Sequence, residues 1–292
     1  MWRSFLFIPV LEEKFIAKAA SRGADAVVLD LEASIDPARK DEAREALPDA
    51  VMRLASNVDV TVRINAVWAP AFRDLEACVI EGVSAIHLPL SENAAQVAAI
   101  SAMIGELEEE RGLDPGKIGL VTMLESAGAV LKASEIANAS PRLVGMTVGV
   151  EDYATSMGVT ATPEVLRPAV QKVNQAARAA SVTSYAIAAS MSDFRDVDGL
   201  RDAASYARAI GTSGGYAVHP AQVAVMNDVF SPSEAELDWA KRVVDAADTA
   251  SKNGQGIFKV DGQMIDLPLV TRAKMLLSRA SVSQIAIREM GK

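Results

Sequence analysis

The chain has 292 residues, half of them apolar, a formal net charge of −9 and a single cysteine. This length suits one large α/β barrel or two small domains. The negative charge argues against nucleic acid as a partner, and no apolar run reaches the roughly 18 residues of a membrane span. With Cys78 alone, an internal disulfide and a cysteine-cluster metal site are excluded. We therefore expect a cytoplasmic enzyme that acts on a small molecule.

Short apolar runs alternate with helical patterns along residues 1–230. Such runs are typical of strands buried on both faces of a parallel sheet. Eight strand–helix units over this length predict a (β/α)8 TIM barrel that forms the catalytic domain. The expected strands cover residues 5–10, 26–31, 61–65, 85–90, 118–124, 144–150 and 184–189, and an eighth begins within 215–218. The helical patterns cover residues 12–21, 38–55, 72–81, 94–111, 129–138, 165–180 and 199–210.

Residues 231–292 follow a different pattern and are expected to form a C-terminal extension. A capping box is predicted at Ser231–Glu234, opening an amphipathic helix that runs to about Ser251. The Gly-rich segment Gly254–Asp266 predicts a hairpin that turns at Asp261-Gly262, and a last helix follows. This helix–hairpin–helix extension needs a packing partner, which we expect in a neighbouring subunit of a homo-oligomer.

Three charged residues lie at the ends of predicted strands. Glu125 closes the strand over 118–124, Asp152 follows the strand over 144–150, and Arg63 lies near the end of the strand over 61–65. The carboxyl ends of parallel strands meet at one edge of the sheet, where α/β enzymes bind their ligands. Two carboxylates and a guanidinium at one edge suggest a hard divalent metal, Mg2+ or Mn2+, and an anionic substrate.

Each of these side chains also has a structural interpretation. Glu125 and Asp152 can lie at helix starts, where acids are favoured. Arg63 can be one half of a buried ion pair. Glu32 can cap a loop instead of taking part in the site.

Seven short motifs occur in a fixed order along essentially the whole chain. In this order they resemble the citrate lyase β-subunit-like proteins of the HpcH/HpaI aldolase superfamily. That family includes malyl-CoA and citramalyl-CoA lyases and malyl-CoA thioesterases. The motifs are Arg3–Pro9, Asp30–Glu32, Val62–Asn65, Met123–Ser126, Gly149–Asp152, His219–Gln222 and Asp261–Asp266.

The resemblance implies a role for several of these residues. Glu125 and Asp152 would hold Mg2+, which chelates the substrate carboxylate and the adjacent carbonyl or hydroxyl. Arg63 would stabilise the enolate oxygen that forms as the C–C bond breaks. Asp266 would come from an adjacent subunit and handle a proton; its alternative is the N-cap of the final helix. Within the same motifs we assign substrate binding to a second group of residues, Arg3, Glu32 and Asn65.

Three positions depart from the usual family pattern. Ala33 stands where the family usually has Asp, and Leu90 and Gly215 stand where it usually has Lys. The loss of two cations predicts weaker CoA binding than in typical relatives. The cations that remain near the first strand and helix are Arg3, Lys14 and Arg22.

We therefore expect a Mg2+-dependent carbon–carbon lyase of the aldolase or Claisen type. Its substrate would be a β-hydroxyacyl-CoA such as malyl-CoA or citramalyl-CoA, and it would work as a homo-oligomer, a trimer or hexamer. Two alternatives stay open: hydrolysis of the same class of thioester, and a non-catalytic subunit of a lyase complex.

Overall fold

The computed structural model describes residues 1–290, with the side chains of residues 1–278. The chain divides into two compact units, one formed by residues 2–230 and one that begins at Ser231 and includes Met1. Within the described residues, no helix has both the length and the apolar character needed to cross a membrane.

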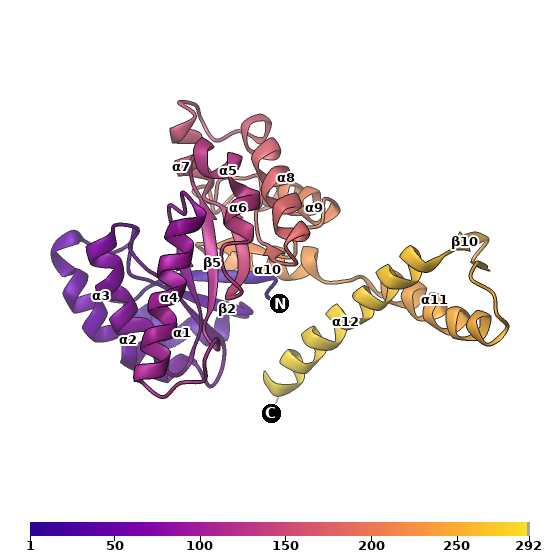
Figure 1. The fold of residues 1–292 in the computed structure, drawn as a ribbon, viewed down its shortest axis with the longest axis horizontal. Helices are drawn as coiled ribbons and strands as arrows, with labels where there is room; N and C mark the ends of the chain where they lie inside the picture. Colours follow the sequence, from indigo (N-terminus) through magenta and orange to yellow (C-terminus); the bar gives the residue numbers. More distant parts are fainter. Residues whose placement is uncertain (291–292) are drawn as a thin grey trace. The chain divides into compact units, whose positions relative to one another are not determined.

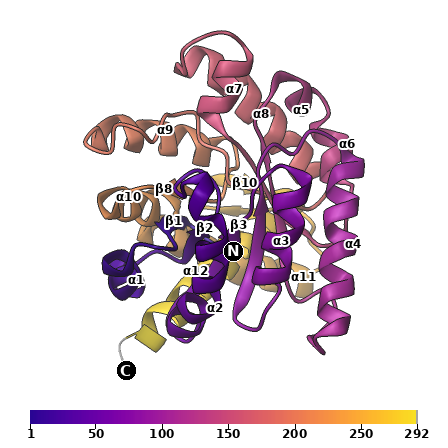
Figure 2. The ribbon, with the colours of Figure 1, turned by 90° about the vertical axis from the view of Figure 1, so that its left-hand side faces the viewer.

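The first unit is built on eight strands that curl into one sheet (Figures 1 and 2). Every strand pairing in this sheet is parallel, in the order β7-β6-β5-β4-β3-β2-β1-β8. The two ends meet where the backbone N–H of Ser213 donates to the carbonyl of Ser184 at 2.9 Å. The predicted (β/α)8 barrel is confirmed. The strands are β1 (Ser4–Pro9), β2 (Ala26–Asp30), β3 (Asp59–Arg63), β4 (Val83–Leu88), β5 (Gly119–Leu124), β6 (Leu143–Val148), β7 (Thr183–Ser184) and β8 (Gly215–Ala217).

Helices connect the strands and cover the outside of the curled sheet (Figure 2). The helical pattern over 129–138 is split into two short helices, α5 and α6, and α7 and α10 cover segments outside the predicted helical patterns. The helices are α1 (Glu13–Ala19), α2 (Lys40–Leu54), α3 (Trp68–Cys78), α4 (Ala94–Glu110), α5 (Ala127–Leu131), α6 (Ala133–Ala137), α7 (Val150–Ser156), α8 (Pro163–Ala179), α9 (Val197–Ala209) and α10 (Pro220–Phe230). Short 3-10 turns, η1 (Ala20–Arg22) and η2 (Pro37–Arg39), precede β2 and α2.

The seventh strand is much shorter than the predicted 184–189. Residues 185–188 are nevertheless buried, and the N–H of Tyr185 still donates to the carbonyl of Met146 at 2.9 Å. Burial produces the same apolar run in a strand and in a buried irregular segment, so the pattern overestimated the strand.

An aromatic and polar cluster fills the inside of the barrel. Phe5 stacks on Tyr216 with ring centroids 4.9 Å apart and meets the edges of Tyr185 and His87. His87 is fully buried and bonds Tyr216 Oη at 3.1 Å and Thr61 Oγ1 at 3.0 Å. Burial lowers the pKa of His87 to about 3, so the ring is neutral and belongs to the core.

The second unit consists of α11 (Glu234–Lys252), a hairpin of β9 (Phe258–Val260) and β10 (Gln263–Ile265), and α12 (Leu267–Met290). The hairpin turns at Asp261 and Gly262 with φ of 52° and 79°, as a tight turn of this sequence requires. The extension has a small core of its own, in which Val243 of α11 packs with Val260 and Ile265. The predicted helix–hairpin–helix order is confirmed.

The capping box of α11 lies two residues beyond its predicted place. The Ser233 hydroxyl accepts the N–H of Glu236 at 3.2 Å, and the Glu236 carboxylate accepts the N–H of Ser233 at 2.7 Å. Ser231 and Ser233 are each followed by a glutamate three residues later, so the sequence alone offered two equivalent boxes.

Candidate active site

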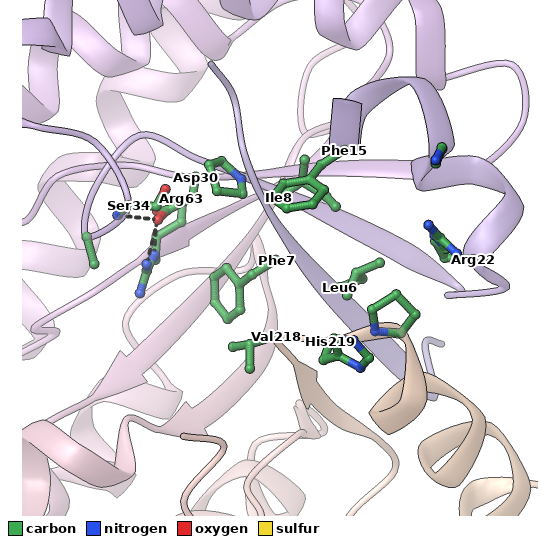
Figure 3. A pocket seen from close by; sticks show the side chains of 14 residues that line it. Leu6, Phe7, Ile8, Phe15, Arg22, Asp30, Ser34, Arg63, Val218 and His219 are labelled. Atoms are coloured by element: carbon green, nitrogen blue, oxygen red, sulfur yellow. Dashed lines mark hydrogen bonds and ion pairs between the residues drawn. The ribbon is translucent and has the colours of Figure 1, made fainter. Parts of the chain in front are cut away.

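Arg63 and Asp30 form the centre of the candidate site at the carboxyl edge of the barrel. They end the neighbouring strands β3 and β2, where they are paired in register. Arg63 Nε lies 2.7 Å from Asp30 Oδ1 and Nη2 lies 2.8 Å from Oδ2 (Figure 3). Glu32 Oε2 lies 3.2 Å from Arg63 Nη1, and the Phe7 ring packs on the guanidinium at 4.5 Å. Arg63 is thus held in a fixed plane by a bidentate partner and an aromatic face.

The local chain stabilises the Asp30 carboxylate. The backbone N–H groups of Glu32 and Ser34 donate to its two oxygens at 3.0 Å and 2.9 Å. Burial alone would raise the pKa of Asp30, but the hydrogen bonds and charge of Arg63 outweigh it, so the pKa is lowered. Asp30 and Arg63 therefore form a charged, bidentate pair.

Glu125 is a buried carboxylate just past β5, only 5% exposed. The backbone N–H of Leu90 donates to its Oε2 at 2.7 Å. On the other side, a Cβ at Gly149 would lie 2.3 Å from Oε1, so a larger residue there would displace the Glu125 side chain. Glu125 does not cap the following helix, because the Ser126 hydroxyl accepts the N–H of Ala129 and serves as the N-cap of α5.

Three carboxylates lie within electrostatic reach of one another at this rim. Burial is the main cause that raises the pKa of Glu125 to about 8, and the charges of Asp152 and Glu32 add to it. Burial likewise raises the pKa of Glu32, with Asp30 and Asp152 adding to the shift. Asp152 itself is exposed in the first turn of α7, which agrees with its interpretation as a helix-start acid. The site holds more negative charge than Arg63 balances.

The carboxylate set suits a hard divalent cation that needs few protein ligands. Among the described residues, no group of three His, Cys, Asp or Glu side chains is arranged as a complete metal cage. Mg2+ does not need one, because it binds through one or two carboxylates together with waters and substrate oxygens. Glu125 and Asp152 therefore supply the two carboxylates that such an ion needs. Burial and the neighbouring charges make the Glu125 carboxylate costly to ionise, and a cation would offset that cost.

Asn65 and Arg3 are placed differently from the residues described so far. Asn65 Nδ2 donates to the carbonyl of Leu31 at 3.0 Å and to Asp74 at 2.6 Å, which ties the segment after β2 to α3. Arg3 precedes β1, at the amino edge of the sheet, and pairs with Asp25 at 2.6 Å. The structure therefore brings Asn65 to the rim but leaves Arg3 at the opposite edge.

Asp266 belongs to the second unit, at the start of α12. Its side chain is exposed, and its backbone carbonyl accepts the N–H groups of Leu269 and Val270 at 3.1 Å each. Its assignment to a neighbouring active site stays a prediction.

A cavity of about 640 Å³ extends from the Arg63–Asp30 pair along the first strand and helix. Arg63 and Arg22 lie at opposite ends of the lining residues in Figure 3. Its wall is largely apolar, with basic side chains contributed by Lys18, Arg22, Arg63 and His219. The lining residues are Leu6, Phe7, Ile8, Pro9, Phe15, Lys18, Arg22, Asp30, Ala33, Ser34, Arg63, Val218, His219 and Pro220.

The cavity changes the expected set of cations. Arg22, one of the three cations named from the sequence, lines it, and so does Lys18, which was not named there. Lys14 is absent from the lining and lies 3.2 Å from Glu12. A Cβ at Gly215 would lie 2.2 Å from Ile187 Cδ1, so a side chain there would point into the core. The lysine missing at position 215 therefore takes nothing from this cavity.

Two further contacts shape the site in ways that the sequence did not predict. Lys40, the first residue of α2, donates from Nζ to the carbonyls of Leu31 and Glu32, at 2.7 Å and 2.5 Å. Leu90 contributes only its backbone N–H to Glu125. The position of Lys40 at the start of the helix after β2 could have indicated its place near the site. A backbone donor such as the Leu90 N–H leaves no signal in the sequence.

Charged side chains gathered at the carboxyl rim of a (β/α)8 barrel lie where the enzymes of this fold carry their active sites. The HpcH/HpaI aldolase/citrate lyase family matches residues 3–220, and the chain belongs to this family. Citrate lyase subunit beta of Escherichia coli (strain K12) is 34% identical over 289 residues, covering 97% of this chain and 94% of that protein. A (3S)-malyl-CoA thioesterase of Cereibacter sphaeroides (strain ATCC 17029) is 33% identical, covering 96% and 94%.

A solved structure is similar over nearly the whole chain. The crystal structure of CitE from Mycobacterium tuberculosis, in complex with magnesium, acetoacetate and coenzyme A, aligns with a TM-score of 0.73 at 33% identity. The match covers 95% of this chain and 97% of that one. The family resemblance read from the seven motifs is confirmed.

Proposed function

We propose that this protein is a Mg2+-dependent carbon–carbon lyase that cleaves a β-hydroxyacyl-CoA such as malyl-CoA or citramalyl-CoA. The observation that carries the proposal is the buried Glu125 carboxylate, flanked by Asp152 and Glu32, on the same rim as the Asp30-held Arg63. The similar CitE structure, which holds magnesium, acetoacetate and coenzyme A, supports the same ligand set here.

Glu125 and Asp152 are the proposed protein ligands of Mg2+. When bound, the ion would polarise the substrate's carboxylate and adjacent hydroxyl and offset the excess negative charge of the rim. The Leu90 N–H donates to one oxygen of the Glu125 carboxylate. The other oxygen lies beside Gly149, which has no Cβ to displace it. Glu32 Oε2 lies 3.2 Å from Arg63 Nη1, and Glu32 is proposed to orient the guanidinium and the substrate.

Arg63 is proposed to stabilise the thioester enolate. As the bond between the α and β carbons breaks, its electron pair moves onto the thioester carbonyl and the β-hydroxyl loses its proton. The oxygen that becomes negative needs a donor already in place, and Asp30 holds the planar guanidinium ready for it. Asp266 of a neighbouring subunit is proposed to handle the proton that the enolate carbon receives.

The cavity is proposed to take the CoA portion of the substrate. Its apolar wall suits the pantetheine arm, while Lys18 and Arg22 suit the phosphates at the end away from Arg63. On a chain with a net charge of −9, such local cations are needed to hold a polyanion. A homo-oligomer, trimer or hexamer, and a cytoplasmic location stay predictions.

Thioester hydrolysis is the second candidate, favoured by the 33% identity to a malyl-CoA thioesterase. In that reaction water attacks the thioester carbonyl and free CoA leaves. The similarity to a citrate lyase subunit keeps a third role, that of a subunit in a larger complex.

A product panel separates these functions. Purified protein is incubated with Mg2+ and malyl-CoA or citramalyl-CoA, and glyoxylate, pyruvate and free thiol are measured separately. We expect a keto acid in equal amount to the acyl-CoA formed, without free thiol. Free thiol without a keto acid would identify a thioesterase, and no turnover of any member would contradict the lyase proposal.

A further inference from the structure

We infer that Leu90 is a positioning residue for Glu125, and that it acts through its backbone and not through its side chain. The inference rests on the proposed role of Glu125 as a metal ligand. It starts from an unusual conformation: Leu90 has φ of +44°, in the left-handed region that residues with a Cβ rarely adopt.

The other non-glycine residues of this kind in the described chain have an evident local cause. Ser181 (φ 60°) lies just after the end of α8, and Asp261 (φ 52°) forms the hairpin turn. Left-handed residues are usual at both kinds of place. Leu90 follows β4 in a loop at the carboxyl rim, and its side chain is 40% exposed, so burial of the side chain does not hold this backbone.

The residues on both sides of Leu90 hold its backbone in place. Upstream, Pro89 closely follows β4 and its ring fixes its own φ. Downstream, the Ser91 N–H donates to the carbonyl of Met123 on β5 at 3.0 Å. The Ser91 hydroxyl donates to the backbone carbonyl of Leu88 at 2.8 Å. With both ends tied, the left-handed turn leaves the Leu90 N–H on Glu125 Oε2 at 2.7 Å.

Glu125 is thereby held from two directions. The Leu90 N–H binds one oxygen, and glycine at position 149 leaves room for the other, which would lie 2.3 Å from a Cβ there. Strain of this kind persists where the surroundings over-determine it, and it gathers at functional sites. A residue that works through its N–H also explains why leucine can stand at a position where the family usually has lysine.

The test uses leucine's own isomer. Leu90→Ile keeps the number of side-chain atoms and the backbone N–H, but it adds a β-branch that disfavours the left-handed backbone. Leu90→Asn changes the side chain fully and tolerates that backbone. We expect Leu90→Ile to weaken Mg2+ binding, measured by calorimetry, by about 10-fold, as for other groups that orient metal ligands. Leu90→Asn keeps the N–H that orients the ligand and should bind Mg2+ as the native protein does.

A matched control separates positioning from general stability. Ser181→Ile places the same branched residue at another left-handed position, so it should lower the melting temperature while leaving Mg2+ affinity unchanged. Loss of Mg2+ affinity in Leu90→Asn, or native affinity in Leu90→Ile, would overturn the inference.

A second measurement does not depend on the metal. Hydrogen exchange of the Leu90 amide, followed by NMR without Mg2+, should be slow in the native protein and faster in Glu125→Ala. If the native protein bound no Mg2+, the proposed function would fail, and this exchange result would still decide whether Leu90 holds Glu125. Unchanged exchange in Glu125→Ala would refute the contact and the inference with it.

Discussion

Asp30 and Arg63 end two neighbouring strands and face each other with two parallel hydrogen bonds of 2.7 Å and 2.8 Å. Asp30 is 2% exposed and Arg63 is 15% exposed in its side chain. The pair is therefore the structural ion pair that the sequence offered as an alternative. It also holds the guanidinium in one orientation. The two interpretations of Arg63 are compatible.

Asp30→Asn tests whether this pairing serves catalysis. Without the carboxylate, Arg63 loses its bidentate partner, and we expect kcat to fall by roughly 10²–10³, as when a transition-state donor is lost. The free energy of unfolding should also fall, by about 3 kcal/mol for a buried pair left with one charge. Steady-state kinetics and thermal unfolding measure the two effects.

The matched control is Asp25→Asn, which breaks the partly buried Arg3–Asp25 pair at the opposite edge of the sheet. It should lower the melting temperature without changing kcat. If Asp30→Asn and Asp25→Asn behaved alike in kinetics, the Asp30–Arg63 pair would be structural only.

Metal-free stability should depend on pH through Glu125. Its pKa in the folded protein is about 8, above its usual 4.5, mainly because it is buried. Since the folded state holds this proton more tightly than the unfolded state, the stabilisation is complete below about pH 4.5 and is lost as pH rises through 8. The melting temperature of native protein in EDTA should therefore fall between pH 6 and 9 more steeply than that of Glu125→Gln. Equal slopes for the two proteins would contradict the raised pKa.

CoA binding should depend on the cations that line the cavity. Lys18→Ala and Arg22→Ala should each weaken CoA binding by up to about 5-fold, the effect of one exposed charge pair. Both changes should also reduce the salt dependence of the affinity. Lys14→Ala is the control, because Lys14 lies outside the lining. Affinity that ignores salt in the native protein would count against an electrostatic role for this end of the cavity.

Asp266 is tested by mixing two inactive proteins. Asp266→Asn should be nearly inactive yet still bind Mg2+, and Arg63→Ala should be inactive for a different reason. If Asp266 serves a neighbouring subunit, subunit exchange between the two variants creates some sites with an intact barrel and an intact extension. Part of the activity should return on mixing. No recovery despite demonstrated exchange would mean that Asp266 has no role in a neighbour's site.

The sequence predicted the barrel well because each strand of a parallel sheet is buried on both faces and leaves an apolar run. It did less well where a buried segment is not paired as a strand, as at residues 186–188, or where two serines offered the same cap, as at Ser231 and Ser233. Glu125, Asp152 and Arg63 could be named as candidates because charges that follow the strands of a parallel sheet share one edge.

Contacts made through the backbone were out of reach of the sequence. The N–H of Leu90 on Glu125 and the carbonyls that receive Lys40 depend on the path of loops, which no residue pattern encodes. Arg3 looked like a rim residue because it adjoins the first strand, but it lies at the end where the strand begins. Lys18 was missed although it stands four residues before Arg22, a spacing that places both side chains on one side of a helical segment.

The central claim is that Glu125 and Asp152 hold the metal on which the reaction depends. Calorimetric titration of Mg2+ into the native protein, Glu125→Ala and Asp152→Ala tests it most directly, with circular dichroism to verify the fold of each variant. We expect one site per chain in the native protein and a loss of at least about 10-fold in affinity in each folded variant. Native Mg2+ affinity in both variants would contradict the assignment of the metal site.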